Sequence, residues 1–255
     1  MAVRPKRKSP VRSPGAIEES REGGCVTATF VHPPLNLIDA SMAARLMQLI
    51  EEAEDDDSIH ALVVVGARDT FCGGFEPEVD PALVESLAAL GKPTLAIING
   101  DALDEGLELA LAADLRLSTA NARFALGQLT RGHLPRFGGT QRLPRLIGVG
   151  PALKMLLTGG AIDGAEALRL RLLTYLAPDP IALKKAADEL LAVLDARGPV
   201  AARLVKEAVL KGMDMTLGQG IRLEEDLYAL LQTTVDRAEG VKAFMEKRKP
   251  LFKGA

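Results

Sequence analysis

Short apolar runs alternate with amphipathic stretches between residues 25 and 148, and this pattern predicts the fold class. Residues 25–31 alternate apolar and polar side chains, which is typical of a strand with one buried face. Residues 39–54 begin at Asp39, a good capping residue, and carry apolar side chains at helical spacing. Residues 61–66, Ala-Leu-Val-Val-Val-Gly, form the continuous apolar run of a strand covered on both faces.

The alternation continues through the middle of the chain. It predicts a short helix over residues 81–90, a strand over 95–98, two short strands over 115–118 and 122–125, and a helix from 138. Strands that alternate with helices in this way imply an α/β layer structure.

From residue 152 onward no strand is predicted, and the apolar spacing favours helices alone. They are expected over residues 152–157, 164–169, 181–197, 200–213, 217–234 and 237–249. The sequence therefore predicts three parts: a basic tail over 1–15, an α/β core over 16–195 and a C-terminal helical region over 196–255.

The stretch over residues 92–114 organises the predicted core. Its strand ends at Ile98, and Asn99-Gly100-Asp101 has the composition of a turn. From Ala102 the chain is rich in Ala, Leu and Glu, so a helix is expected to begin there. A helix start presents unpaired N–H groups and the positive end of the helix dipole. Such an end can hold a developing negative charge.

The composition is that of an ordinary soluble globular protein. The chain has 255 residues, is 47% hydrophobic and 25% charged, and has a formal net charge of -3. This charge gives no overall attraction to nucleic acid, and 4% aromatic residues offer few platforms for base stacking. No apolar run approaches the roughly 20 residues that a membrane helix needs. We therefore expect neither a nucleic-acid nor a membrane partner.

The first fifteen residues differ from the rest of the chain. They contain three prolines, no acidic residue and five basic ones: Arg4, Lys6, Arg7, Lys8 and Arg12. Because no apolar segment follows, the stretch is not a secretory signal. It is expected to be a disordered tail, and the alternative is a weak electrostatic anchor to an acidic partner.

The two cysteines, Cys25 and Cys72, are isolated and lack metal-ligand spacing. They predict a reducing compartment such as the cytoplasm, without a disulfide framework. The three histidines are scattered as well, so no metal site is expected.

Four motifs follow one another along the chain. They are Phe71-Cys-Gly-Gly-Phe75, Asn99-Gly-Asp-Ala-Leu-Asp-Glu-Gly-Leu-Glu108, Gly138-Gly-Thr-Gln-Arg-Leu-Pro-Arg145, and Asp236-Arg-Ala-Glu-Gly240 leading to Phe244-Met-Glu-Lys-Arg248. In this order they resemble the crotonase superfamily, the enoyl-CoA hydratase/isomerase fold, from about Cys25 to Gly254. The resemblance implies a crotonase-type spiral of ββα units and a C-terminal helical oligomerisation region that builds trimers, often paired into hexamers.

The resemblance also implies an oxyanion hole for an acyl-CoA thioester. By motif position its two backbone N–H donors are those of Phe75 and Glu105. Gly74 and Gly106 stand beside them and are expected to line the substrate-binding path. Family members usually carry Ala or Gly at both donor positions, so the Phe75 side chain is expected to reshape the acyl pocket.

Hydratases of this family use two glutamates. Glu108 matches the first, but Gln128 stands at the position of the second. An amide orients water or substrate but does not carry a proton near neutral pH. As a hypothesis, Glu105 replaces the missing acid, since residues three apart on a helix lie about 5–6 Å apart. The alternative is that Glu105 and Asp104 only favour the helix N-terminus.

For coenzyme A, the resemblance implies contacts from Phe244 and Lys247, usually reached from a neighbouring subunit. No separate cofactor is expected, because the CoA thioester is itself the substrate.

Three functions stay open on the sequence alone. The first is a hydro-lyase that adds water to a 2-enoyl-CoA with Glu108 as the main acid and base. The second is an isomerase or decarboxylase that needs at most one carboxylate. The third is a non-catalytic acyl-CoA-binding protein.

Overall fold

The computed structural model describes residues 14–254, and its main sheet has six strands in the order β1-β2-β3-β5-β7-β10. The predicted tail lies outside the described residues except for its last two. The strands are β1 (Ala16–Glu22), β2 (Cys25–Val31), β3 (Ala61–Gly66), β5 (Thr94–Ile98), β7 (Leu115–Thr119) and β10 (Tyr175–Ala177). All neighbours pair in parallel except β1 and β2, which form an antiparallel hairpin.

A second sheet of four short strands lies beyond the first. It has the order β4-β6-β8-β9, with β4 (Thr70–Cys72), β6 (Asp101–Leu103), β8 (Arg123–Ala125) and β9 (Ile162–Asp163). Each passage of the chain places one strand in each sheet and then returns through a helix. The pairs β3-β4, β5-β6 and β7-β8 therefore form successive turns of a spiral.

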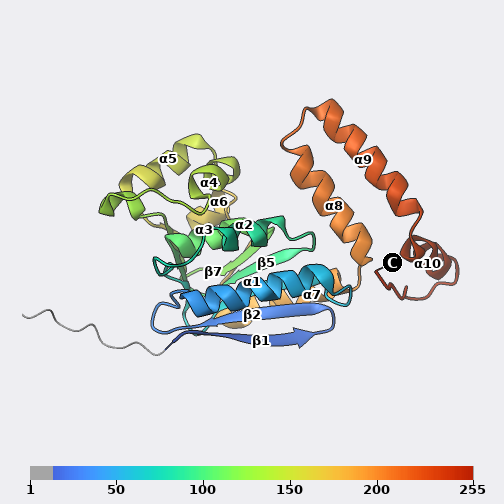
Figure 1. Cartoon of the computed structure of the whole chain (residues 1–255), viewed down its shortest axis with the longest axis horizontal. Helices are drawn as coiled ribbons and strands as arrows, with labels where there is room; N and C mark the ends of the chain where they lie inside the picture. Colours follow the sequence, from blue (N-terminus) through green and yellow to red (C-terminus); the bar gives the residue numbers. More distant parts are fainter. Residues whose placement is uncertain (1–13, 255) are drawn as a thin grey trace, which may run out of the picture.

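Helices cover both faces of the main sheet (Figure 1). The helices of the core are α1 (Ala40–Asp55), α2 (Ala82–Ala89), α3 (Glu105–Ala112), α4 (Gly139–Ile147), α5 (Val149–Thr158), α6 (Gly164–Arg169) and α7 (Pro180–Asp195). A single 3-10 turn, η1 (Gln128–Arg131), precedes α4. The larger apolar core includes Leu46 of α1, Leu62 of β3 and Leu107 of α3, and a smaller one joins the sheet to Leu183 of α7.

The last three helices are α8 (Pro199–Gly212), α9 (Leu217–Gln232) and α10 (Val235–Met245). Figure 1 shows α8 and α9 as an antiparallel pair that extends beside the core. No residue of α9 is buried, and Tyr228 and Leu230 are more than half exposed. An apolar surface of this extent is typical of a face that another chain covers. None of the helices within residues 14–254 combines the length and apolarity needed to cross a bilayer.

The helices predicted from periodicity are present with shifted ends, but five short or exposed strands were not predicted. These are β1, β4, β6, β9 and β10, and the last two contradict the expectation of helices alone after residue 152. Strands of two or three residues are too short to show a period, and β1 is an exposed edge strand with little apolar alternation. The predicted helix start at Ala102 is also wrong, because that residue pairs in β6 and α3 begins at Glu105.

Candidate active site

Glu108 is fully buried in α3, and its carboxylate is held by backbone donors. Its Oε1 atom accepts hydrogen bonds from the N–H groups of Phe137, at 2.9 Å, and Gly139, at 2.8 Å. A Cβ atom on Gly139 would lie 2.9 Å from this oxygen, so a side chain there would crowd the contact. The Gly-Gly start of α4 therefore acts as a cradle for one oxygen of Glu108.

The other carboxylate oxygen, Oε2, faces Gln128. The Gln128 side-chain N–H donates to it over 3.1 Å, and Gln128 is itself 2% exposed. The Gln128 Oε1 atom is buried and has no hydrogen-bond partner in the structure. A buried amide oxygen without a partner is costly. This oxygen is therefore available to a bound hydroxyl or water.

Burial raises the pKa of Glu108 from 4.5 to about 7. The N–H groups of Gly139 and Phe137 oppose this shift because they stabilise the charged form. The nearby charge of Glu105 raises the pKa further, and that of Arg142 lowers it. A carboxylic acid with a pKa near neutrality can both accept and return a proton, which general acid–base catalysis requires.

The backbone of Phe75 presents its N–H toward α3. The backbone groups on either side already have partners, because the Gly74 C=O accepts from the Ile38 N–H and the Glu76 N–H donates to the Ile38 C=O. The Phe75 N–H instead donates to Glu105 Oε2 over 3.4 Å, a long bond. In the free protein, the carboxylate of Glu105 therefore lies at the donor predicted for a thioester oxygen.

The Glu105 N–H belongs to the first residue of α3, where backbone donors have no partner within the helix. The Phe75 ring packs edge-on against Phe137, with ring centroids 5.0 Å apart. The two rings thus pack together beside the donor residue and the Glu108 cradle. That the side chain of Phe75 shapes an acyl pocket stays a prediction.

Both predicted binding glycines lie where a side chain would collide. Gly74 has φ +137, a region that favours glycine, and a Cβ there would lie 2.9 Å from Glu105 Oε2. A Cβ on Gly106 would lie 2.2 Å from the carbonyl oxygen of Cys72. Gly106 therefore lets the first turn of α3 approach β4.

Phe244 and Lys247 are placed far from these residues. Phe244 is 86% exposed on α10, and Lys247 follows that helix with φ 53. Figure 1 shows α10 on the opposite side of the molecule from α3 and α4. Within one subunit the two residues do not join the site around Glu108.

The sequence did not single out Phe137 and Gly139 as partners of Glu108, although Gly139 lies in a recognised motif. From the sequence, Asp104 was expected at most to favour the helix N-terminus. Its side chain makes no cap there, and it instead links α3 to the turn that carries Gln128 through two side-chain hydrogen bonds. A backbone donor leaves no mark on residue type.

Both free cysteines are buried, which raises the pKa of Cys25 to about 11 and that of Cys72 to about 12.

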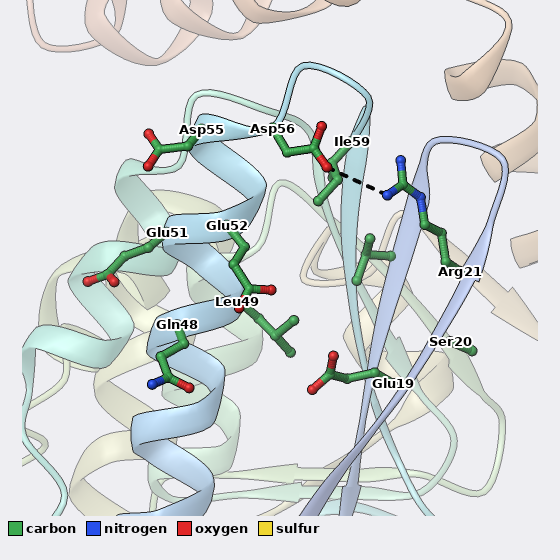
Figure 2. A pocket seen from close by; sticks show the side chains of 11 residues that line it. Glu19, Ser20, Arg21, Gln48, Leu49, Glu51, Glu52, Asp55, Asp56 and Ile59 are labelled. Atoms are coloured by element: carbon green, nitrogen blue, oxygen red, sulfur yellow. Dashed lines mark ion pairs between the residues drawn. The ribbon is translucent and has the colours of Figure 1, made fainter.

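Within residues 14–254 no group of three or more His, Cys, Asp or Glu residues is arranged to hold a metal ion. A separate pocket of about 820 Å³ lies between β1 and α1 (Figure 2). Its side chains include five carboxylates and Arg21, whose guanidinium lies 3.6 Å from Asp56. A predominantly acidic pocket disfavours phosphate groups, and none of the predicted site residues lines it.

Comparison with known proteins places these features in context. A family model described as enoyl-CoA hydratase/isomerase matches residues 20–255. An (E)-benzylidenesuccinyl-CoA hydratase from Thauera aromatica is 36% identical over 87% of this chain and 92% of its own length. A 2,3-dehydroadipyl-CoA hydratase from Escherichia coli is 34% identical over 92% and 97%.

Solved structures are similar over nearly the whole chain. The crystal structure of an enoyl-CoA hydratase from Bacillus anthracis has a TM-score of 0.89 at 30% identity, covering 95% of this chain and 100% of that one. An enoyl-CoA hydratase subunit from Geobacillus kaustophilus has a TM-score of 0.86 at 32% identity, over 94% and 98%. These similarities confirm the predicted fold class, a crotonase-type spiral with a C-terminal helical region.

Proposed function

The chain belongs to the enoyl-CoA hydratase/isomerase family, and on this premise we propose that it adds water across the double bond of a 2-enoyl-CoA. The observation that carries the proposal is the buried carboxylate of Glu108, with one oxygen held by two N–H groups and the other directed at an amide. Its pKa of about 7 suits transfer of a proton at neutral pH. The hydratases among its relatives support the same reaction class.

The thioester oxygen is proposed to bind between the N–H groups of Phe75 and Glu105. Preorganised donors of this kind typically contribute about 3–4 kcal/mol of transition-state stabilisation each. The Glu105 carboxylate must first leave the Phe75 N–H, and the long 3.4 Å bond suggests that this displacement costs little. As negative charge develops on the thioester oxygen, the N-terminal end of α3 stabilises it.

Glu108 is proposed to act through Oε2, because Oε1 is occupied by two backbone donors. Ionised Oε2 takes a proton from water as the water oxygen bonds to the β carbon, and the electron pair moves onto the thioester oxygen. Glu108 then returns the proton to the α carbon as the carbonyl re-forms. The unpartnered Oε1 atom of Gln128 is proposed to accept the second hydrogen of the water.

A double-bond isomerase is the alternative that a specific observation favours. Gln128 replaces the second carboxylate of the hydratase pattern, and moving a proton between two carbons needs one carboxylate only. The hypothesis that Glu105 supplies the missing acid stays open, since its charge reaches Glu108 while its hydrogen bond goes to Phe75.

Incubation with crotonyl-CoA and, separately, with a 3-enoyl-CoA decides between these functions. Loss of the absorbance of the conjugated thioester, with a 3-hydroxyacyl-CoA product, supports hydration. Conversion of a 3-enoyl-CoA into a 2-enoyl-CoA without hydration supports isomerisation. Tight acyl-CoA binding without turnover of either class indicates a non-catalytic binder and contradicts the proposal.

The assembly is proposed to be a trimer or a pair of trimers. Support comes from the exposed apolar residues of α8–α10, and from the placement of α10 on the opposite side of one subunit from α3 (Figure 1). In such an assembly Phe244 and Lys247 of one copy reach the CoA bound by its neighbour. The reaction is redox-neutral and uses no cofactor besides the CoA thioester. Two buried free thiols suit the cytoplasm or another reducing compartment.

A further inference from the structure

Asp104 connects β6 to α3 in a backbone conformation that L-residues rarely adopt. Its φ is 50 and its ψ is -122, and it makes no side-chain cap to the helix that it precedes. Conformations of this kind are strained, and they persist where surrounding contacts enforce them. The contacts at Asp104 show what holds it there.

Three of the four polar groups of Asp104 reach the same neighbouring segment, and the fourth, its C=O, accepts from the Glu108 N–H in α3. Its backbone N–H donates to Ala125 C=O over 2.8 Å. Its Oδ1 atom accepts from Gly127 N–H at 2.7 Å, and its Oδ2 atom accepts from Arg131 Nη2 at 2.8 Å. The Asp104 carboxylate is 16% exposed and its bond to Gly127 is partly buried, whereas the Arg131 side chain is 55% exposed and that ion pair is open to solvent.

The segment that Asp104 holds is the single turn that carries Gln128. Gly127 immediately precedes this turn, and Arg131 is its last residue. Gln128 lies between these two anchors and donates to Glu108 Oε2. Asp104 thus fixes both ends of a four-residue turn. It immediately precedes α3, and Glu108 lies one helical turn further along that helix.

We propose that Asp104 is a positioning residue that holds the amide of Gln128 against Glu108, and so sets where the reacting water sits. The inference rests on the proposed function and extends it to a residue whose side chain has no hydrogen bond to Glu108. The backbone C=O of Asp104 accepts from the Glu108 N–H at 3.1 Å, and every side-chain variant at this position keeps that bond. A displacement of about 1 Å in a contact such as that of Gln128 with Glu108 can reduce the rate roughly 100-fold.

A nearby pair separates positioning from general stabilisation. Asp101, in β6, accepts from the Arg123 N–H at 3.0 Å and pairs with the Arg123 guanidinium. The Asp101–Arg123 pair joins β6 to β8 with the same residue types as the Asp104–Arg131 pair. Asp101, however, has no hydrogen bond to the turn that carries Gln128. Asp101 is therefore a matched control for Asp104.

The test compares Asp104→Gly, Asp104→Asn and Asp101→Gly in the full-length protein. Glycine accepts φ 50 without strain, so Asp104→Gly removes the carboxylate while the fold is retained. We expect kcat for crotonyl-CoA to fall roughly 10- to 100-fold, with KM changed by less than about threefold. Asn keeps an oxygen for Gly127 and should restore most of the rate. Asp101→Gly should lower Tm without changing kcat.

The pH profile provides a readout that a purely structural role would not move. An N–H donor favours the charged carboxylate, so loss of the Gln128 contact should raise the Glu108 midpoint by about half a pH unit or more. Unchanged kcat and an unchanged midpoint in Asp104→Gly would overturn the proposal. A loss that Asp101→Gly reproduces would overturn it as well.

If the wild-type protein turns over no acyl-CoA, the proposed function fails, and the role of Asp104 is then decided by a direct titration. The Glu108 carboxyl carbon, assigned with Glu108→Gln, is followed by ¹³C NMR in wild type and Asp104→Gly. A higher midpoint in the variant supports positioning of Gln128, and identical titrations reject it.

Discussion

Gln128 donates its side-chain N–H to Glu108 Oε2 over 3.1 Å, while its own side-chain oxygen has no partner. In this pair only one member can carry a proton. The chemistry available near Glu108 therefore differs from that of a site with two carboxylates.

Replacement of Glu108 by Gln should abolish turnover while the protein stays folded. Gln presents an oxygen to Phe137 and Gly139, but it cannot take a proton from water. We expect kcat to fall at least about 100-fold, within the usual range for a general acid–base residue. Activity within about threefold of wild type would exclude Glu108 as the main acid and base.

The same variant should be more stable than wild type at high pH. Because the pKa of Glu108 is raised to about 7, the folded protein binds more protons than the unfolded chain between pH 4.5 and 7. Wild-type stability therefore falls as pH rises through this window, and above it the penalty is on the order of 3 kcal/mol. Urea unfolding at pH 5 and pH 8 should show the advantage of Glu108→Gln growing with pH.

The profile of kcat/KM against pH should show a single ionisation in the neutral range. Glu108 takes a proton from water and returns it to carbon, so the enzyme must start and finish each turnover with this group ionised. For hydration and for dehydration alike, kcat/KM should decrease below a midpoint near pH 7. Opposite pH dependences for the two directions would contradict a single carboxylate.

Replacement of Gln128 by Glu should introduce a second limb. Two carboxylates in this buried contact cannot both be ionised at low cost, so one retains its proton. We expect a bell-shaped profile of kcat/KM, measured from pH 5 to pH 9 with crotonyl-CoA. Gln128→Met, of similar length and without an acceptor oxygen, serves as the control and should lose activity at every pH.

Replacement of Glu105 by Ala should strengthen substrate binding. The thioester oxygen no longer displaces a carboxylate from the Phe75 N–H, and a negative charge near the developing oxyanion is removed. We expect KM for crotonyl-CoA to decrease severalfold and the Glu108 midpoint to move to lower pH, since Glu105 raises that pKa. Glu78→Ala removes an exposed acid from the loop that follows Phe75, and it should change neither the KM nor the Glu108 midpoint. A large fall in kcat for Glu105→Ala would instead support a proton-transfer role for Glu105.

The sequence by itself determined the α/β class and the long helices, and it identified Glu108 as the candidate acid and base. Long helices repeat an apolar period several times, so they are readable from residue order, as in α1 with its Asp39 cap. Short strands such as β6 show no period, and only their pairing with distant segments defines them.

Only the tertiary structure decided the environment of Glu108. Its pKa near 7 depends on burial, on two N–H groups from residues 139 and 137, and on the charges of Glu105 and Arg142. The occupation of the Phe75 N–H by Glu105 depends equally on a contact between segments 30 residues apart. Residue types along a chain set which groups are present, but desolvation and the direction of backbone donors arise only when separate turns of the spiral pack together.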